Sequence, residues 1–80
     1  MTTLSQRLAL LAEPVRIRIL ALLEQQELVV GELVRILQLP QSTVSRHLKA
    51  LRTAGWIERR SEGTAALMHM PAPPADGAEL

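Results

Sequence analysis

The sequence has no cysteine, only one aromatic residue and no long apolar run. Without cysteine there is no disulfide, no thiolate nucleophile and no cysteine metal site, and 2 isolated histidines make a poor set of metal ligands. The apolar runs are far shorter than the roughly 20 residues of a membrane span. The N-terminus MTTLSQRLALLAEPVR lacks the basic start, apolar stretch and cleavage site of a signal peptide. We therefore expect a cytoplasmic protein with no metal, no cofactor and no membrane association.

Catalytic patterns are also missing. The sequence shows no nucleophile beside a base, no Gly-rich phosphate loop and no carboxylate pair that an enclosed pocket could hold. Its 80 residues make one domain at most. A chain this short buries only about 60 to 65% of its unfolded surface, so a lone monomer should be marginally stable. We expect a protein that is not an enzyme and that gains stability from a partner subunit.

The charges are unevenly placed, although the formal net charge is only +1. Between Arg46 and Arg60 there are five Lys or Arg residues and a single acid, Glu58. Such a local basic patch attracts phosphate, but it is also typical of a solvated helix face. Charge alone does not separate these two interpretations.

Apolar periodicity predicts about four helices. A first helix begins near Leu4, with Leu4, Leu8 and Leu11 at helical spacing, and a second begins at Pro14 and is apolar around most of its circumference. A short extended piece, residues 28–30, leads into a third helix that ends near Gln38 and buries Leu33, Ile36 and Leu37. Pro40 starts a fourth helix, which Gly55 ends as a left-handed cap. Two helices joined by so tight a turn form a helix-turn-helix.

The C-terminal part predicts a β-hairpin and a tail. WIERR and TAALMHM flank Ser61-Glu62-Gly63, and a glycine between two extended segments is the ordinary signal of a hairpin. The expected fold class is therefore mainly α with a small two-stranded wing, a winged helix-turn-helix. We assign residues 1–70 to this domain, and residues 71–80 to a disordered tail or the truncated start of a last helix.

The fourth helix predicts a polar outward face. At about 100° per residue, Val44, Leu48 and Leu51 form the buried stripe and His47 lies close to its edge. Such a polar face, basic toward its middle, suits a helix whose first turns enter a DNA major groove, with the wing arginines against the backbone. The residues expected to contact DNA are Gln41, Ser42, Thr43, Ser45, Arg46, His47, Lys49, Arg59 and Arg60.

Each of these residue types also has a plainer use. Ser42 and Thr43 can simply cap the helix, Arg46 and Lys49 can keep it soluble, and His47 can contact a neighbouring side chain instead of DNA. Trp56 could stack on bases but more often fills the seam between wing and helices. The presence of both a helix-turn-helix and a basic wing favours nucleic-acid binding.

The segments LAEPVRIRILALL, ELVVGELVRIL and LPQSTVSRHLKALRTAGWIERRSEG resemble successive signatures of the ArsR family of bacterial winged-helix repressors, from about Leu8 to Gly63. STVSRHLKALRTAG is the most specific part. The resemblance implies a homodimer bound to an imperfect inverted repeat in a promoter. It also implies that residues 40–54 are the recognition helix and residues 56–70 the wing.

The sequence departs from the family pattern in three places. Val29 and Gly31 stand where the metal-sensing branch has a cysteine pair, so thiolate-metal sensing is excluded. Val29 also replaces a Ser or Thr cap three residues before Glu32, which leaves half a capping box. The return strand AALMHM lacks the usual aromatic pair, and the chain stops where a last dimerising helix would begin. We expect a natural or engineered fragment of a longer protein.

The function expected from the sequence is that of an ArsR-type regulator, most simply a repressor, that binds a specific double-stranded DNA site. Leu4, Leu8 and Leu11 are the expected dimer interface, because a lone domain cannot cover both these leucines and the second helix. Two alternatives stay open: a winged helix used as a protein-interaction module, and the N-terminal regulatory part of a larger protein such as a methyltransferase fusion. The sequence does not identify the operator or the inducing ligand.

Overall fold

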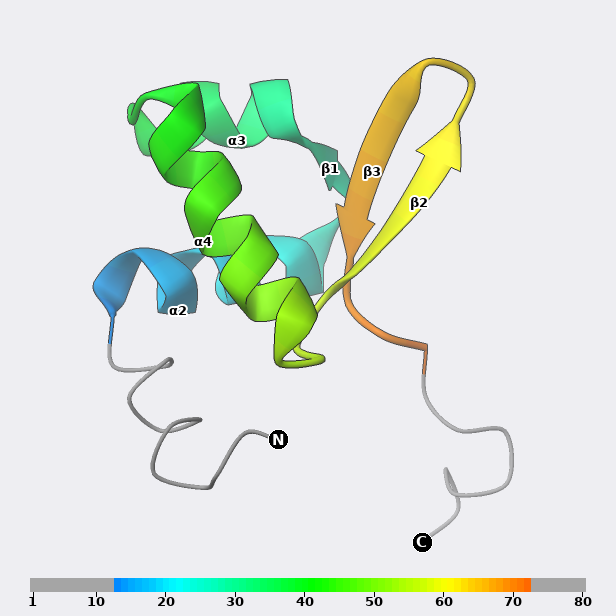
Figure 1. Cartoon of the computed structure of the whole chain (residues 1–80), viewed down its shortest axis with the longest axis horizontal. Coiled ribbons are helices and arrows are strands. Elements are labelled where there is room, and N and C mark those ends of the chain that lie inside the picture. Colours follow the sequence, from blue (N-terminus) through cyan, green and yellow to red (C-terminus); the bar gives the residue numbers. More distant parts are fainter. Residues whose placement is uncertain (1–12, 73–80) are drawn as a thin grey trace, which may run out of the picture.

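The computed structural model describes residues 13–72 as three helices beside a small antiparallel sheet (Figure 1). The elements follow in the order α2 (Pro14–Gln25), β1 (Leu28–Val29), α3 (Val30–Leu37), α4 (Gln41–Thr53), β2 (Glu58–Glu62) and β3 (Ala65–His69). This order confirms the predicted mainly helical fold with a hairpin. The predicted first helix, with Leu4, Leu8 and Leu11, and residues 73–80 of the predicted tail lie outside the described residues. Among residues 13–72, no helix has the length and apolar character needed to span a membrane.

Helix α2 begins with Pro14 at its first position, where a missing N–H costs no hydrogen bond. Ile19 and Leu23, one turn apart, are its buried residues. Ile17 on the same helix is 52% exposed, which agrees with the expectation that a lone domain cannot cover all of this apolar helix.

Strand β1 is shorter than predicted. Val30 is already the first residue of α3 rather than the end of the extended piece.

The predicted half of a capping box is present at the start of α3, because the backbone N–H of Val29 donates to Oε1 of Glu32 at 3.0 Å. The valine side chain has no acceptor with which to return that bond. Helix α3 therefore starts with one of the two reciprocal bonds.

The apolar face of α3 also differs in part from the prediction. Leu33 and Leu37 are buried as expected, but Ile36 is 38% exposed. Val30 and Val34 pack against the core in its place. Positions 30, 33, 34 and 37 form one helical stripe, and the stripe that includes position 36 lies further round the helix.

The turn between α3 and α4 is tight. Gln38 closes α3 in the left-handed region at φ 57°, and its N–H donates to the Val34 carbonyl at 2.9 Å. Pro40 precedes α4 as its N-cap instead of being its first residue, and its carbonyl accepts from the N–H of Thr43 at 3.0 Å and of Val44 at 3.1 Å. The two helices meet as the predicted helix-turn-helix.

The other end of α4 confirms the predicted glycine cap. Gly55 has φ +84°, and its N–H donates to the Arg52 carbonyl at 3.0 Å. The N–H of Trp56 donates to the Leu51 carbonyl at 2.9 Å. This pair of bonds is a Schellman motif, which turns the chain from the helix into the wing.

The sheet has three strands, in the order β1-β3-β2, where two were predicted. Leu28 pairs with Met68, so that β1 attaches the hairpin to the helices. Glu62 pairs with Ala65, and the loop is therefore Gly63-Thr64 instead of the predicted Ser61-Glu62-Gly63. Gly63 has φ +62°, which suits the first position of a type II′ turn. Figure 1 shows the hairpin standing to one side of the helices.

A single aliphatic core joins the helices to the sheet. Its buried residues are Ile19, Leu23, Leu28, Leu33, Leu37, Val44, Leu48, Leu51, Ile57 and Met68. Trp56 is half-buried and packs against this core, which agrees with the interpretation that it fills the seam below the wing. The core fixes how the outer face of α4 and the wing are set against each other.

Candidate nucleic-acid interface

The outer face of α4 is polar and exposed, as its periodicity predicts. Val44, Leu48 and Leu51 are buried at 0%, 2% and 0% exposure, which turns the opposite side of the helix to solvent. The exposed residues on that side are Gln41, Ser42, Ser45, Arg46, Lys49, Arg52 and Thr53, with Thr43 half-buried. No side chain caps the start of α4, so the hydroxyls of Ser42 and Thr43 do not act as caps.

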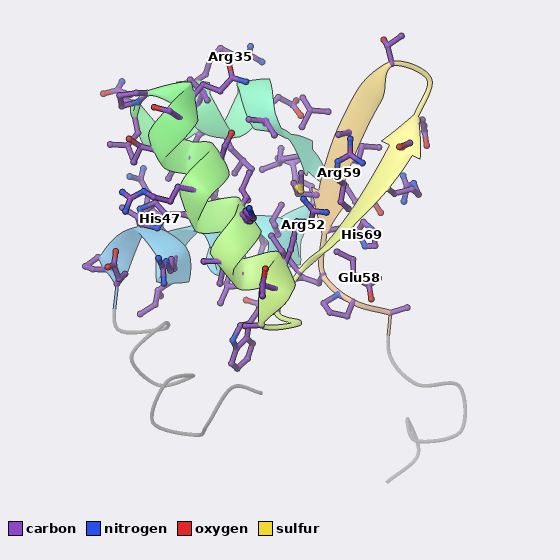
Figure 2. All side chains as sticks on the ribbon, in the orientation of Figure 1. Arg35, His47, Arg52, Glu58, Arg59 and His69 are labelled. Carbon is purple, nitrogen blue, oxygen red and sulfur yellow. The ribbon has the colours of Figure 1, made fainter. Side chains whose placement is uncertain are left out.

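A groove runs between α4 and the wing. It has a volume of about 740 Å³ and is lined by Ser45, Lys49, Arg52, Thr53, Ile57, Glu58 and Arg59. Ile57 is a core residue with 2% exposure, whereas the lining cations are exposed. Figure 2 shows Arg52 of α4 and Arg59 of β2 on the same side of the molecule, between helix and wing.

Three cations and one carboxylate make this groove electropositive. Lys49, Arg52 and Arg59 line it together with the single acid Glu58. Arg52 and Thr53 were not among the residues predicted from the sequence. The signal for Arg52 was present, because Ser45, Lys49 and Arg52 are spaced i, i+4, i+7 and so share one helix face. An anion such as a backbone phosphate is the ligand that this charge favours.

The two wing arginines have different surroundings. Arg59 lines the groove, but Arg60 lies on the other face of β2, because successive strand residues alternate. Nη2 of Arg60 donates to Oε1 of Glu27 at 2.6 Å, Nη1 donates to Oε2 of Glu27 at 3.1 Å, and Nη2 also reaches Glu62 at 3.3 Å. The hydrogen bonds from Arg60 hold the pKa of Glu27 below its ordinary value, and Glu27 in turn raises the pKa of Arg60. The structure therefore does not bring Arg60 into the groove.

His47 requires a correction. It was expected among the DNA contacts, but only 3% of it is exposed, on the inner side of α4. Its Nδ1 accepts a hydrogen bond from Nε of Arg16 at 2.9 Å, and Figure 2 shows it on the side of α4 that faces α2. A side chain so enclosed cannot reach a phosphate or a base. The alternative that it contacts a neighbouring side chain is the one the structure shows.

No metal centre is formed within the part of the chain that the structure describes. Residues 13–72 contain no group of three His, Cys, Asp or Glu side chains that could hold a metal ion. Met68 is buried in the core at 3% exposure, and Nδ1 of the half-buried His69 lies 2.8 Å from the Met70 carbonyl oxygen. Met68 and His69 therefore point to different faces of β3, as their alternation along the strand predicts.

Comparison with known proteins places this geometry in a family. The family described as "Bacterial regulatory protein, arsR family" matches residues 13–59, which include the helix-turn-helix and the start of the wing. The HTH-type transcriptional repressor SmtB of Mycobacterium tuberculosis is 42% identical over 60 residues, which are 75% of this chain and 44% of SmtB. The chain thus spans less than half the length of that relative.

Solved structures of similar proteins share the fold. The crystal structure of Rv0081 from M. tuberculosis is 39% identical, with a TM-score of 0.82 over 94% of this chain and 74% of that one. The solution structure of a fragment of Mb0332 from Mycobacterium bovis, described as a homodimeric winged helix-turn-helix DNA-binding domain, is 33% identical. It has a TM-score of 0.75 over 80% of this chain and 59% of that one.

Proposed function

Because the chain belongs to the arsR family of bacterial regulatory proteins, we propose that it binds a specific double-stranded DNA site and regulates transcription, as a repressor in the cytoplasm. The observation that carries this proposal is the electropositive groove between α4 and β2. Lys49, Arg52 and Arg59, which line it, would hold the DNA backbone there. The family is one of regulators, and we propose no catalytic activity.

In this proposal, the N-terminal half of α4 contacts the bases. Gln41 can pair with adenine and Arg46 with guanine in a major groove, while Ser42, Thr43 and Ser45 can bond bases or phosphates. All but Thr43 are exposed, and Thr43 is half-buried. The groove lies further along the same helix, beside the wing, where the DNA backbone would pass.

The protein would act as a homodimer on an inverted repeat. Mb0332, a similar protein, is described as homodimeric, which supports a dimer here. We propose that Leu4, Leu8 and Leu11, which lie outside the described residues, form the interface. Two recognition helices related by a two-fold axis would then enter successive major grooves about 34 Å apart.

The test is a selection of binding sites from random duplex DNA, followed by titration of the selected site at several salt concentrations. Each phosphate that a cation neutralises contributes about −0.9 to the slope of log affinity against log salt concentration. Lys49→Gln and Arg52→Gln should each make that slope shallower. Arg18→Gln, which changes an exposed cation of α2 that does not line the groove, is the matched control and should leave it unchanged. Failure to enrich any duplex would refute the proposal and favour a protein-interaction module.

A further inference from the structure

His47 is the one buried polar side chain among residues 13–72. It lies on the inner face of the proposed recognition helix, where its neighbours Val44, Leu48 and Leu51 are aliphatic. A leucine at this position would avoid the cost of burying a polar group, which is incurred unless that group is hydrogen-bonded. The bond that His47 makes therefore indicates what the histidine does there.

That bond joins two helices that are distant in the sequence. Nε of Arg16, in the first turn of α2, donates to Nδ1 of His47 at 2.9 Å across 31 residues. Only a neutral imidazole with its proton on Nε2 can accept this bond. Glu13 lies on the same side, with its Oε2 4.0 Å from the same Nδ1.

A hydrogen bond of this kind restrains α4 in a way that aliphatic packing does not. The burial of Val44, Leu48 and Leu51 is favourable without a preferred direction, whereas the Arg16–His47 bond requires one direction and one distance. His47 directly follows Arg46, so the direction in which His47 points inward also sets the direction in which Arg46 points outward. A small rotation of α4 about its own axis would move Arg46 away from a base edge.

We propose that Arg16 and His47 are positioning residues for DNA recognition, which together fix the rotation and axial position of α4. The inference rests on the proposed function and deepens it. The pair contributes to discrimination between sites rather than to attraction for DNA in general. Phosphate attraction depends on the cations of the groove and tolerates small rotations of the helix.

Protonation of His47 abolishes this restraint. A protonated Nδ1 donates instead of accepting, so it loses the bond from Arg16 and places a second positive charge beside the guanidinium. Burial is the main cause that lowers the pKa of His47, followed by the charges of Arg16 and Arg46, while Glu13 opposes them.

Helix α3, which also packs on α4, does not alter the pKa of His47. Helix α3 carries Glu32 and Arg35, and neither is among the groups that shift the pKa of His47. The imidazole is therefore neutral near neutral pH. Because the pKa of His47 is lowered from the ordinary histidine value of 6.5, specific recognition should decline only at a pH clearly below 6.5.

The experiment measures two dissociation constants, for the selected site and for random duplex of equal length, from about pH 7.5 to about pH 5 at fixed salt. His47→Asn keeps an acceptor near the position of Nδ1 but does not titrate. His47→Leu and Arg16→Met keep the apolar packing and remove the bond. His69→Asn changes the other histidine and controls for its titration. Thermal unfolding of each variant identifies conditions in which all are folded.

For the wild type, the ratio of specific to random affinity should fall with acidification, and His47→Asn should keep a high ratio throughout. His47→Leu and Arg16→Met should lower the ratio by about tenfold at every pH, which is the discrimination carried by one good base contact, with random-duplex affinity nearly unchanged. A pH dependence that persists in His47→Asn, or a wild-type ratio in folded Arg16→Met, overturns the inference. Should His47→Leu not fold, His47→Asn and Arg16→Met carry the test. Wild-type protein that binds no duplex at any pH refutes the proposed function itself.

Discussion

The structure predicts that changing Arg59 weakens DNA binding, whereas changing the adjacent Arg60 leaves it nearly unaltered. Arg59 lines the groove, whereas Arg60 donates two hydrogen bonds to Glu27, at 2.6 and 3.1 Å. Arg59→Gln should therefore remove one phosphate contact from each protomer. Arg60→Gln should remove none, because its charge is already matched by a carboxylate.

The size of the effect follows from counterion release. One phosphate contact contributes about 0.9 to the salt slope, so losing two from a dimer makes the slope shallower by about 1.8. The contribution of a phosphate contact vanishes at about 1 M salt, one decade above 0.1 M. At 0.1 M salt, losing one contact therefore lowers the affinity about eightfold, and losing both lowers it about sixtyfold. The drop should be the same for the selected site and for random DNA, because a phosphate contact carries no sequence information.

Glu27→Gln is the informative third variant. Removing the carboxylate leaves Arg60 paired with Glu62 alone and makes the wing more positive, so the affinity for DNA should rise. Fluorescence anisotropy with a labelled duplex, repeated at four or five salt concentrations, measures all three variants. If Arg60→Gln flattens the slope as much as Arg59→Gln and Glu27→Gln changes nothing, the division of roles on the wing is wrong.

Three further predictions concern stability and assembly. Gly55→Ala should lower the free energy of unfolding, measured by urea titration, by about 1 kcal/mol, because φ +84° is unfavourable for a residue with a Cβ. Gln38→Gly, at φ 57°, should raise it for the same reason, and equal effects of the two variants would contradict this account. Because the pKa of His47 is lowered in the folded state, the unfolded chain binds more protons as the pH falls below 6.5. The melting temperature should therefore decrease over that pH range, and it should decrease less in His47→Asn than in wild type. An equal decrease in both proteins would argue against this account. Leu8→Glu should prevent both dimer formation in sedimentation and protection of a full palindrome, and a variant that stays dimeric would show that the subunits meet elsewhere.

Local patterns predicted the elements of α4 well. The spacing of Val44, Leu48 and Leu51 identified the buried stripe, and Gly55 identified the end of the helix, because both signals lie within a few residues of the structure that they determine. Ile36 shows where such patterns stop. Ile36 follows Leu33 and Val34 follows Val30 at helical spacing, and only the packing of α3 against its neighbours decides that Val34 contacts the core while Ile36 is exposed.

Contacts between distant segments could not be predicted from local patterns. The Arg16–His47 bond spans 31 residues and the Glu27–Arg60 pair spans 33. Each depends on how two elements are set against each other, which no periodicity records. The groove could have been partly anticipated, because Arg52 shares a helix face with Lys49. The residues of β2 that line the groove could not be predicted, because they depend on the register of β2 against β3, which the turn at Gly63 and Thr64 sets.

The position of β2 at the outside of the sheet has a consequence for solubility. In the order β1-β3-β2, one side of β2 has no strand partner within the described sheet, and such edges can pair with strands of other molecules. All five residues of β2, Glu-Arg-Arg-Ser-Glu, are exposed, and four of them are charged. Charged side chains on an edge strand oppose its extension by another copy. The arginines and glutamates of the wing therefore also protect the chain from edge-to-edge aggregation, and variants that remove several of these charges at once should become less soluble.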